Sequence, residues 1–237
     1  MPATQQLLVV CAVDAEAAAV AASFAVDEVH VGPLPARRLR AGGGVVDVVT
    51  SGIGPAAAAA AAGFGLGTGR YDAVLSAGIA GAFVDGGAVV GGLAIADAIV
   101  FADLGVLTPD GFASIASLGF GDGLERVVPP AAAVAALQER CATTGLPVAT
   151  GTLLTLATFT GTDGRAAELI GRHPAVAEAM EGSGVACAAA MAGVPALELR
   201  SISNLVGDRD REAWDLPGAL HALTAASAAA LADELPL

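Results

Sequence analysis

The chain has 237 residues, of which 55% are hydrophobic and 15% are charged, and its formal net charge is −13. This length is enough for one large α/β domain, which we expect over residues 1–237. The negative charge argues against nucleic acid as a partner, because such binding depends on basic side chains neutralising phosphates, and it also disfavours anionic membrane surfaces.

Apolar runs and turn residues predict an alternation of strands and helices. Strands are expected over residues 7–13, 45–50, 73–76, 93–101, 148–156 and 196–204. Helices are expected over residues 14–24, 55–62, 130–144, 163–171, 183–192 and 217–235. Residues 77–81 are predicted to form a tight glycine turn, and residues 105–128 an irregular loop that covers a site or meets a partner. This alternation favours an α/β three-layer sandwich with a mixed, largely parallel central sheet.

The cysteines and the apolar runs bear on the cellular location of the protein. Three cysteines are scattered along the chain: Cys11, Cys141 and Cys187. Because no export signal is recognisable at the N-terminus, we expect these thiols to be reduced and the protein to be cytoplasmic. Asp97 and Asp103 interrupt the apolar run at residues 88–107, so a core strand is expected there rather than a membrane span. The sequence has no Cys-x-x-Cys or His-x-x-x-His pattern, and no metal site is expected.

A glycine-rich turn follows the second expected strand. The sequence Gly52-Ile53-Gly54-Pro55 imitates a dinucleotide-binding fingerprint, and Asp72 follows at about the 20-residue spacing of that fingerprint. Its position on the second strand-helix unit, with Pro55 in the first turn of a helix, favours an ordinary strand-to-helix turn. A dinucleotide-binding module is the alternative from another functional class.

The segment from Met180 to Asn204 carries the most specific pattern in the chain. Glu181 precedes a helix of small residues, a Gly-Val-Pro sequence ends that helix, and the strand that follows ends at Ser203 and Asn204. Ligands of open α/β sheets bind outside the carboxyl ends of the strands, which is where Asn204 is expected. In order, spacing and chemistry, this segment resembles the purine nucleoside phosphorylase/nucleosidase superfamily. The similarity extends over nearly the whole chain and weakens between residues 105 and 150.

The resemblance implies a sugar-binding end of the site. There, Glu16 would activate a water molecule, and Gly78 would let the backbone approach the ribosyl group. Met180 would pack on the sugar, and Glu181 would accept hydrogen bonds from its 2′ and 3′ hydroxyls. Taken alone, Glu16 would be an ordinary first-turn acid that complements the helix dipole, and Gly78 part of a plain turn. The first 30 residues contain no lysine or arginine, which favours water over phosphate as the nucleophile.

The resemblance also implies a base-binding end. Phe159 would stack on the purine, while backbone groups around Thr160 would meet the edge of the base. Asn204, next to Ser203, stands where adenine-specific members have an aspartate. An amide carries both a donor and an acceptor, so its NH₂ group suits N7 and the 6-oxo oxygen of hypoxanthine. A core phenylalanine and a turn-capping asparagine are the structural alternatives.

The residues after this strand bear on the 5′ side of the substrate. Arg209, Arg211 and Trp214 resemble the branch of the family whose hypoxanthine nucleoside carries an aryl carboxylate there. An arginine can hold a carboxylate by two parallel hydrogen bonds, and Trp214 would pack on the aryl ring. Alternatively, Asp208 and Asp210 pair with both arginines in a solvated charge run.

Together, these features imply hydrolysis of the N-glycosidic bond of a 6-oxopurine nucleoside. The resemblance implies no cofactor, a small-molecule substrate, and a homodimer or larger homo-oligomer. A methylthioadenosine/S-adenosylhomocysteine nucleosidase is the alternative within the class, and Asn204 argues against it. A phosphorylase is less favoured still.

Overall fold

The computed structural model describes residues 4–120, 123–208 and 213–237. Its strands in chain order are β1 (Gln6–Cys11), β2 (Val26–Val31), β3 (Leu34–Ala41), β4 (Gly44–Thr50), β5 (Ala73–Ala82), β6 (Leu93–Phe101), β7 (Gly105–Thr108), β8 (Gly111–Ser114), β9 (Arg126–Val127), β10 (Val148–Thr155), β11 (Ala177–Ala179) and β12 (Ala196–Leu205). All of them except β7 and β8 form one sheet of order β11-β10-β6-β12-β5-β1-β4-β3-β2, with β9 paired to β6. The neighbours of β1 are parallel to it, whereas β2, β3 and β4 pair antiparallel, so the sheet is mixed as expected.

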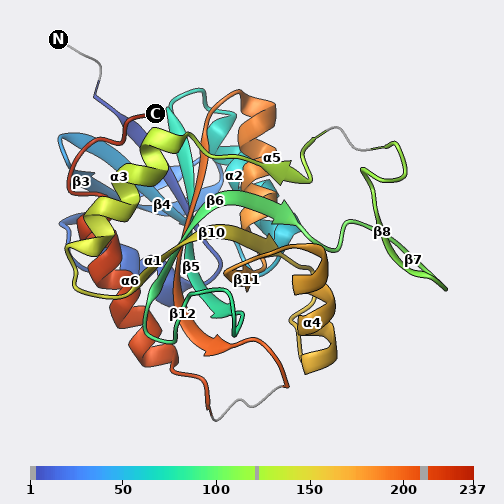
Figure 1. Ribbon diagram of the computed structural model, residues 1–237. Coiled ribbons are helices and arrows are strands. Elements are labelled where there is room, and N and C mark those ends of the chain that lie inside the picture. The colour runs from blue at the N-terminus through green and yellow to red at the C-terminus, as the bar shows by residue number, and fades with distance from the viewer. Residues whose placement is uncertain (1–3, 121–122, 209–212) are drawn as a thin grey trace.

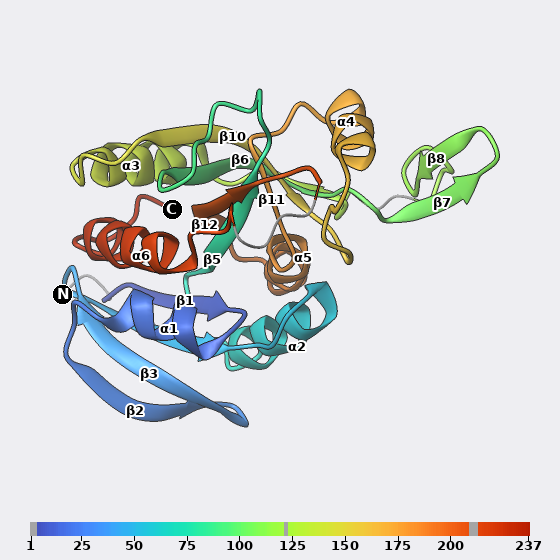
Figure 2. The same ribbon diagram turned by 90° about the horizontal axis from the view of Figure 1, so that it is seen from below.

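Helices cover both faces of this sheet. They are α1 (Asp14–Ala21), α2 (Pro55–Leu66), α3 (Ala131–Ala142), α4 (Asp163–Arg172), α5 (Gly182–Ala192) and α6 (Leu216–Ala230). Helices α1, α3 and α6 share one apolar core with the sheet, α2 and α5 share a second, and α4 packs in a smaller third cluster (Figure 1, Figure 2). The three-layer α/β sandwich is therefore confirmed.

Alanine and glycine let α2 and α5 approach each other closely. A side chain at Gly184 of α5 would collide with the backbone of α2 at Pro55 and Ala59. Gly193 ends α5 in the left-handed conformation, with a φ of 71°, as expected for a helix terminated by glycine. The tight pair of helices places the start of α5 beside the start of α2, and this junction contributes to the site.

Part of the sheet closes on itself. Strand β11 pairs with β10 on one side and with β5 on the other. The pairs β5–β12, β12–β6 and β6–β10 complete a ring of strands. In this ring, Gly81 of β5 is opposite Glu178 of β11 on one edge and opposite Asn204 of β12 on the other. Residues from two distant parts of the sequence are thereby brought to the two sides of one glycine.

The structure corrects the predicted glycine turn at residues 77–81. These residues continue β5, which runs from Ala73 to Ala82, and Gly78 and Gly81 have ordinary strand conformations. The glycines are needed for space rather than for a turn. A side chain at Gly78 would lie 2.5 Å from Oε1 of Glu16 and 2.7 Å from Nη1 of Arg200. We infer that close approach of side chains from two other elements requires glycine at this position.

The expected irregular loop at residues 105–128 is only partly irregular. It contains the hairpin β7–β8, which projects from the body of the protein, and the short strand β9 (Figure 1). The hairpin β2–β3 was not predicted, because charged residues interrupt the apolar pattern of both strands, which lie at the edge of the sheet and next to it. Strand β11 was not predicted either, since three residues are too few to show a period.

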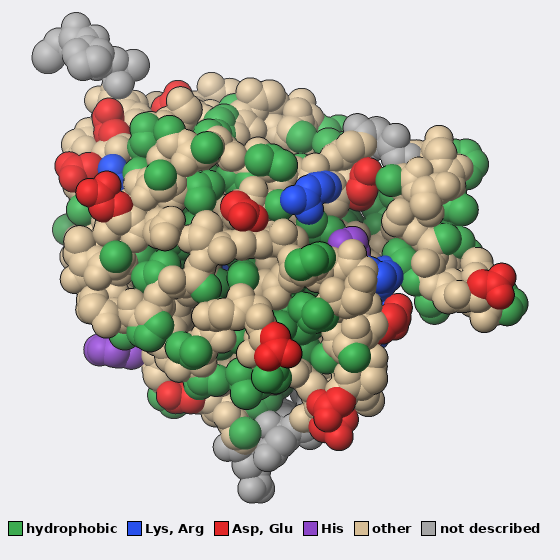
Figure 3. All heavy atoms as spheres, viewed as in Figure 1, with side chains coloured by type: hydrophobic (Ala, Val, Ile, Leu, Met, Phe, Trp, Pro, Cys, Tyr) green, Lys and Arg blue, Asp and Glu red, His purple; other side chains and the backbone are tan. Residues whose placement is uncertain are grey.

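The surface agrees with the acidic composition. On the face shown in Figure 3, acidic side chains are scattered and few basic ones appear. The apolar run at residues 88–107 contains the core strand β6, in which Asp97 is exposed. None of the helices in the described ranges is both long enough and apolar enough to cross a membrane.

Candidate active site

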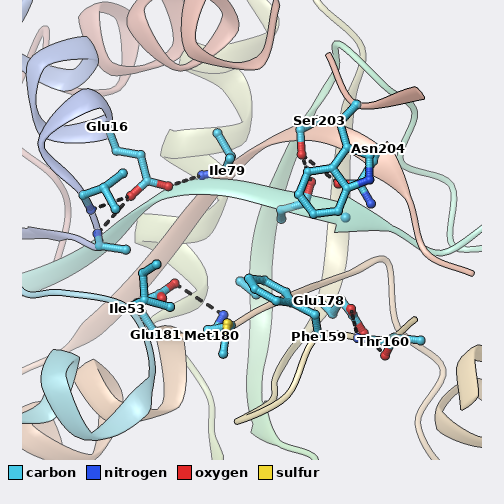
Figure 4. A pocket seen from close by; sticks show the side chains of 16 residues that line it. Glu16, Ile53, Ile79, Phe159, Thr160, Glu178, Met180, Glu181, Ser203 and Asn204 are labelled. Atoms are coloured by element: carbon cyan, nitrogen blue, oxygen red, sulfur yellow. Dashed lines mark hydrogen bonds between the residues drawn. The ribbon is translucent and has the colours of Figure 1, made fainter. Parts of the chain in front are cut away.

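A cavity of about 150 Å³ lies beside the ring of strands (Figure 4). Its lining includes most of the residues that the sequence singled out: Glu16, Phe159, Thr160, Met180, Glu181, Ser203, Asn204 and Trp214. Gly78 does not line the cavity but lies beneath the carboxylate of Glu16. Arg209 and Arg211 lie outside the described residues.

Glu16 forms one end of the cavity. It stands in the first turn of α1, and only 3% of its surface is exposed. Its Oε2 accepts hydrogen bonds from the amides of Ala12 and Val13 at 2.9 and 3.2 Å, and its Oε1 accepts one from the amide of Ile79 at 2.9 Å. Burial raises the pKa of Glu16, while the positive charge of Arg200 opposes that rise. The carboxylate is therefore fixed in position and is more basic than an exposed glutamate.

Glu181 stands at the same end of the cavity as Glu16 (Figure 4). Its Oε1 accepts a hydrogen bond from the amide of Gly54 at 3.1 Å, and its Oε2 accepts one from Arg200 at 3.3 Å. The glycine turn that imitates a dinucleotide fingerprint thus forms the entry to α2 and holds a carboxylate of the cavity. This is the ordinary strand-to-helix turn that the sequence favours.

Arg200 holds two buried acids in place by hydrogen bonds. Sequence reasoning did not identify it as a site residue. Its side chain is 1% exposed. It donates to Oε1 of Glu198 at 2.9 Å, to Oγ of Ser76 at 2.7 Å and to Glu181. The negative charges of Glu198 and Glu181 raise the pKa of Arg200 against the effect of burial, so the guanidinium stays charged. The available signal was an arginine two residues after a glutamate inside a strand that is otherwise mostly apolar and small, since buried charges need partners.

The end of the cavity away from Glu16 depends on an irregularity in β12. Neighbouring side chains of a strand normally point to opposite faces, yet Ser203 and Asn204 both line the cavity. The pairing of β12 with β5 shifts between Ile202 and Asn204, which leaves Ser203 as an extra residue in a β-bulge. Bulges of this kind redirect side chains near functional sites. This one turns the amide of Asn204 into the cavity.

Hydrogen bonds fix the orientation of the Asn204 amide. Its Nδ2 donates to the carbonyl of Leu205 at 2.9 Å, and its Oδ1 accepts from the hydroxyl of Ser203 at 2.8 Å. Because a carbonyl oxygen can only accept, the nitrogen must face Leu205. The NH₂ group keeps a second hydrogen for a ligand, and Oδ1 keeps a second lone pair.

Glu178 also lines this end of the cavity, although sequence reasoning gave it no role. It is 7% exposed and lines the cavity. Its Oε1 accepts a hydrogen bond from the amide of Thr160 at 3.0 Å, and its Oε2 accepts one from the hydroxyl of Thr160 at 2.5 Å. Burial raises the pKa of Glu178, and the two bonds from Thr160 act in the opposite direction. The three-residue strand that carries it gave no sequence signal.

Two aromatic rings also line the cavity. Phe159 and Trp214 meet edge to face, with their centroids 6.5 Å apart and their planes at 73°. Trp214 also borders a second hollow that it shares with Thr160 and Asn204. Asp208, which the sequence pairs with the neighbouring arginines as an alternative, accepts a hydrogen bond from the amide of Asp163 at 3.1 Å.

The cavity offers acids, an amide and aromatic rings. Over the described part of the chain, no lysine or arginine lines it, and no group of three potential metal ligands occurs. Cys11 is buried beside Glu16, and burial raises the pKa of its thiol well above the usual range, so it is a packing residue rather than a nucleophile.

The closed ring of strands, the fixed carboxylates and the amide are the arrangement expected of enzymes that cleave the bond between a purine base and its sugar, and the comparisons with known proteins show this class. The family described as the phosphorylase superfamily matches residues 6–235. A futalosine hydrolase of Streptomyces coelicolor is 50% identical over 92% of this chain and 92% of its own length. One from Acidothermus cellulolyticus is 46% identical over 94% of this chain and 88% of its own. The chain therefore belongs to the phosphorylase superfamily and, within it, to the same family as these two hydrolases.

Solved structures show the same fold. The methylthioadenosine/S-adenosylhomocysteine nucleosidase of Neisseria meningitidis has a TM-score of 0.83 at 20% identity, covering 96% of this chain and 99% of that one. The native futalosine hydrolase of Helicobacter pylori has a TM-score of 0.77 at 19% identity, covering 94% of each chain. At such low identity, these structures bear on the fold and not on the choice of substrate.

Proposed function

We propose that the protein hydrolyses the N-glycosidic bond of futalosine and releases hypoxanthine and dehypoxanthine futalosine, a step towards menaquinone. The observation that carries this proposal is the amide of Asn204 at one end of a cavity whose other end holds Glu16. An amide with a spare N–H suits a 6-oxopurine, and a buried carboxylate suits the activation of water. The two futalosine hydrolases near 50% identity support the same substrate.

The proposed reaction assigns a task to each end of the cavity. Glu16 accepts a proton from water as the water oxygen bonds to C1′ and the bond from C1′ to N9 breaks. Glu181 accepts hydrogen bonds from the sugar hydroxyls, which strengthen as positive charge develops on the sugar. Asn204 donates to the base as it leaves with the electron pair, the departing hypoxanthine anion takes a proton from solvent, and Glu16 returns its proton to solvent. Phe159 stacks on the base, and Met180 packs on the sugar.

Gly78 and Arg200 support the sugar end without reacting. The missing side chain at Gly78 leaves room for the carboxylate of Glu16 and the guanidinium of Arg200 to converge. Arg200 donates a hydrogen bond to Oε2 of Glu181 and so holds this carboxylate in position for the sugar hydroxyls. Ser203 holds Oδ1 of Asn204, which presents the NH₂ group to the base.

On the 5′ side, the proposal includes Arg209, Arg211 and Trp214. At least one of the two arginines contacts the carboxylate of futalosine, and Trp214 packs on its aryl ring. Arg209→Ala and Arg211→Ala should be compared on futalosine and on inosine, which lacks the aryl carboxylate. Loss confined to futalosine supports the contact, whereas equal loss on both substrates removes it.

The proposal also covers assembly and location. The hairpin β7–β8 and the segment after it expose large apolar side chains, among them Leu107 at 79% and Phe120 at 77%. This apolar surface supports a homodimer or larger homo-oligomer formed through residues 105–120. Leu107→Asp with Phe120→Asp should then lower the molar mass measured by light scattering. Scattered reduced thiols support a cytoplasmic location, and residues 1–237 are proposed to act as one domain.

A substrate panel tests the proposed function. The protein is incubated with futalosine, inosine and methylthioadenosine, each with and without phosphate, and the released base is identified. Hypoxanthine released from futalosine at equal rates with and without phosphate supports the proposal. Release of adenine from methylthioadenosine alone would instead establish the adenine-specific nucleosidase, and strict dependence on phosphate would establish a phosphorylase.

A further inference from the structure

The base end of the cavity holds a second polar group opposite Asn204. Glu178 and Asn204 are the partners of Gly81 on the two edges of β5, and both side chains line the cavity. Figure 4 shows Glu178 with Thr160 on one wall and Ser203 with Asn204 on the wall facing them. The backbones of β11 and β12 are two strand spacings apart, about 10 Å. Gly81 contributes no side chain between them, and a Cβ there would lie only 3.1 Å from Nδ2 of Asn204, so glycine leaves the space that the Asn204 amide occupies.

The carboxylate of Glu178 keeps accepting capacity for a ligand. Each of its oxygens takes one hydrogen bond from Thr160, whereas an ionised carboxylate offers about four lone-pair sites. The two bonds also fix the side chain, which lowers the entropy cost of holding a ligand. Burying a carboxylate costs free energy unless it is hydrogen-bonded. An apolar side chain would therefore line this wall at lower cost if the residue made no contact with a ligand.

The role of Glu178 follows from the chemistry of the base and rests on the proposed function. A 6-oxopurine carries a hydrogen on N1, whereas N1 of a 6-aminopurine carries a lone pair. A base whose N7 and O6 face Asn204 presents N1–H on the neighbouring edge of its six-membered ring, on the far side of O6 from N7, where it can meet the wall that carries Glu178. We infer that Glu178 accepts a hydrogen bond from N1–H of the 6-oxopurine base and thereby selects 6-oxopurines against 6-aminopurines. With a 6-aminopurine, the N1 lone pair would face the carboxylate oxygens.

The variant Glu178→Gln tests this role while preserving the wall. Its Oε1 can still accept from the amide of Thr160, and its NH₂ group can donate to the hydroxyl of Thr160, which is free to rotate. What is lost is the second acceptor for the base. We expect the ratio of kcat/KM on futalosine to kcat/KM on its 6-amino analogue to fall by roughly 10- to 100-fold, as for loss of a hydrogen bond to a charged group.

Two further variants separate selection of the base by Glu178 from structural support of the cavity wall. Thr160→Val removes one donor to Glu178 but leaves the carboxylate, so it should lower both kcat/KM values by similar factors and leave their ratio near that of the wild type. Glu168→Gln changes a surface acid of α4 whose partners are Arg165 and Arg172, and should leave both values unchanged. A ratio that is unchanged in Glu178→Gln, while wild-type protein hydrolyses futalosine, overturns the inference and leaves the proposed function intact.

A binding measurement does not depend on turnover. Calorimetry compares hypoxanthine with 1-methylhypoxanthine, which lacks the N1–H donor. Wild-type protein should bind hypoxanthine at least 10-fold more tightly, by roughly the free energy of one charge-assisted hydrogen bond, and Glu178→Gln should lose most of this difference. Because a methyl group also adds bulk, a difference that is equally large in Glu178→Gln overturns the inference. If that variant does not fold, equal binding of both bases by wild-type protein overturns it. Failure to hydrolyse futalosine while this preference persists counts against the proposed function alone.

Discussion

The carboxylate of Glu16 and the backbone amide of Ile79 are 2.9 Å apart, and this bond ties the first turn of α1 to the middle of β5. The bond is possible because Gly78, the residue before Ile79, has no side chain to displace the carboxylate. Position and basicity of Glu16 therefore depend on a glycine that takes no part in the chemistry.

Replacement of that glycine tests the dependence. In Gly78→Ala, the new methyl group would lie 2.5 Å from Glu16 and 2.7 Å from Arg200, so both side chains must move. We expect kcat to fall by about 100-fold, as for misplacement of a catalytic group, and the free energy of unfolding to fall by about 1–3 kcal/mol. Steady-state kinetics and urea unfolding measure the two effects. Gly63→Ala on α2, where nothing lies within 4 Å of the new methyl group, should retain full activity and equal or greater stability.

The pH dependence of the reaction should report Glu16. A protonated Glu16 cannot take a proton from water, and burial raises its pKa above the ordinary value. The kcat/KM for futalosine should therefore decrease as the pH falls through this raised pKa, at a higher pH than for an exposed glutamate of pKa about 4.3. In Glu16→Gln, the rate should be roughly 10²- to 10⁴-fold lower, and this acid limb should be absent. Near wild-type turnover by a folded Gln variant would exclude Glu16 as the base.

The choice between oxo and amino bases should depend on Asn204. In Asn204→Asp, a carboxylate oxygen would replace the NH₂ group that faces the carbonyl of Leu205, and the donor to the base would be lost. Hydrolysis of futalosine should weaken relative to that of its 6-amino analogue, with the ratio of kcat/KM values changing by about 100-fold or more. Ser203→Ala leaves the bond to Leu205 in place, so it should change this ratio far less. An unchanged ratio in Asn204→Asp would show that the amide does not contact the base.

The buried Arg200 should be essential for stability. Its removal in Arg200→Met leaves the carboxylates of Glu198 and Glu181 without their cation, and we expect a loss of about 3–5 kcal/mol at neutral pH. Burial raises the pKa of Glu198 and Arg200 opposes that rise, so the substitution raises this pKa further. The folded variant then takes up a proton, and its deficit should shrink as the pH falls towards the ordinary glutamate pKa of about 4.3.

Urea unfolding at several pH values measures this effect. Arg37→Ala breaks the exposed pair with Asp14 and should cost less than about 1 kcal/mol at every pH. If Arg200→Met lost as little free energy of unfolding as Arg37→Ala, the buried carboxylates would be stabilised without Arg200, and the prediction would be wrong.

The sequence predicts the layers of the fold because its longer elements have a clear period. Strands β1, β4, β6 and β10 and helices α2, α3 and α6 lie close to their expected positions. Residues 77–81 were misjudged because glycine has two uses that look alike in a sequence: it permits turns, and it makes space inside a strand. Only the neighbours of Gly78, which come from α1 and β12, distinguish the two.

The site was accessible from the sequence only in part. Three site residues stand at or near the ends of elements that the sequence predicts clearly: Glu16, Glu181 and Asn204. For these residues, the family motif and the expected position in the fold indicate the same role. Glu178 could not be predicted, since its role depends on the pairing of β11 with β5, which closes the ring. The β-bulge at Ser203 also depends on pairing between strands and has no mark in the sequence.

Hydrolysis of futalosine by water held at Glu16 is tested most directly by isotope transfer. Purified protein is incubated with futalosine in phosphate-free water carrying a heavy oxygen isotope, and the products are analysed at once by mass spectrometry. We expect hypoxanthine without label and dehypoxanthine futalosine with one heavy oxygen at C1′, formed at a rate that falls roughly 10²- to 10⁴-fold in Glu16→Gln. No release of base, or release that requires phosphate and yields a sugar phosphate, would contradict the proposed reaction.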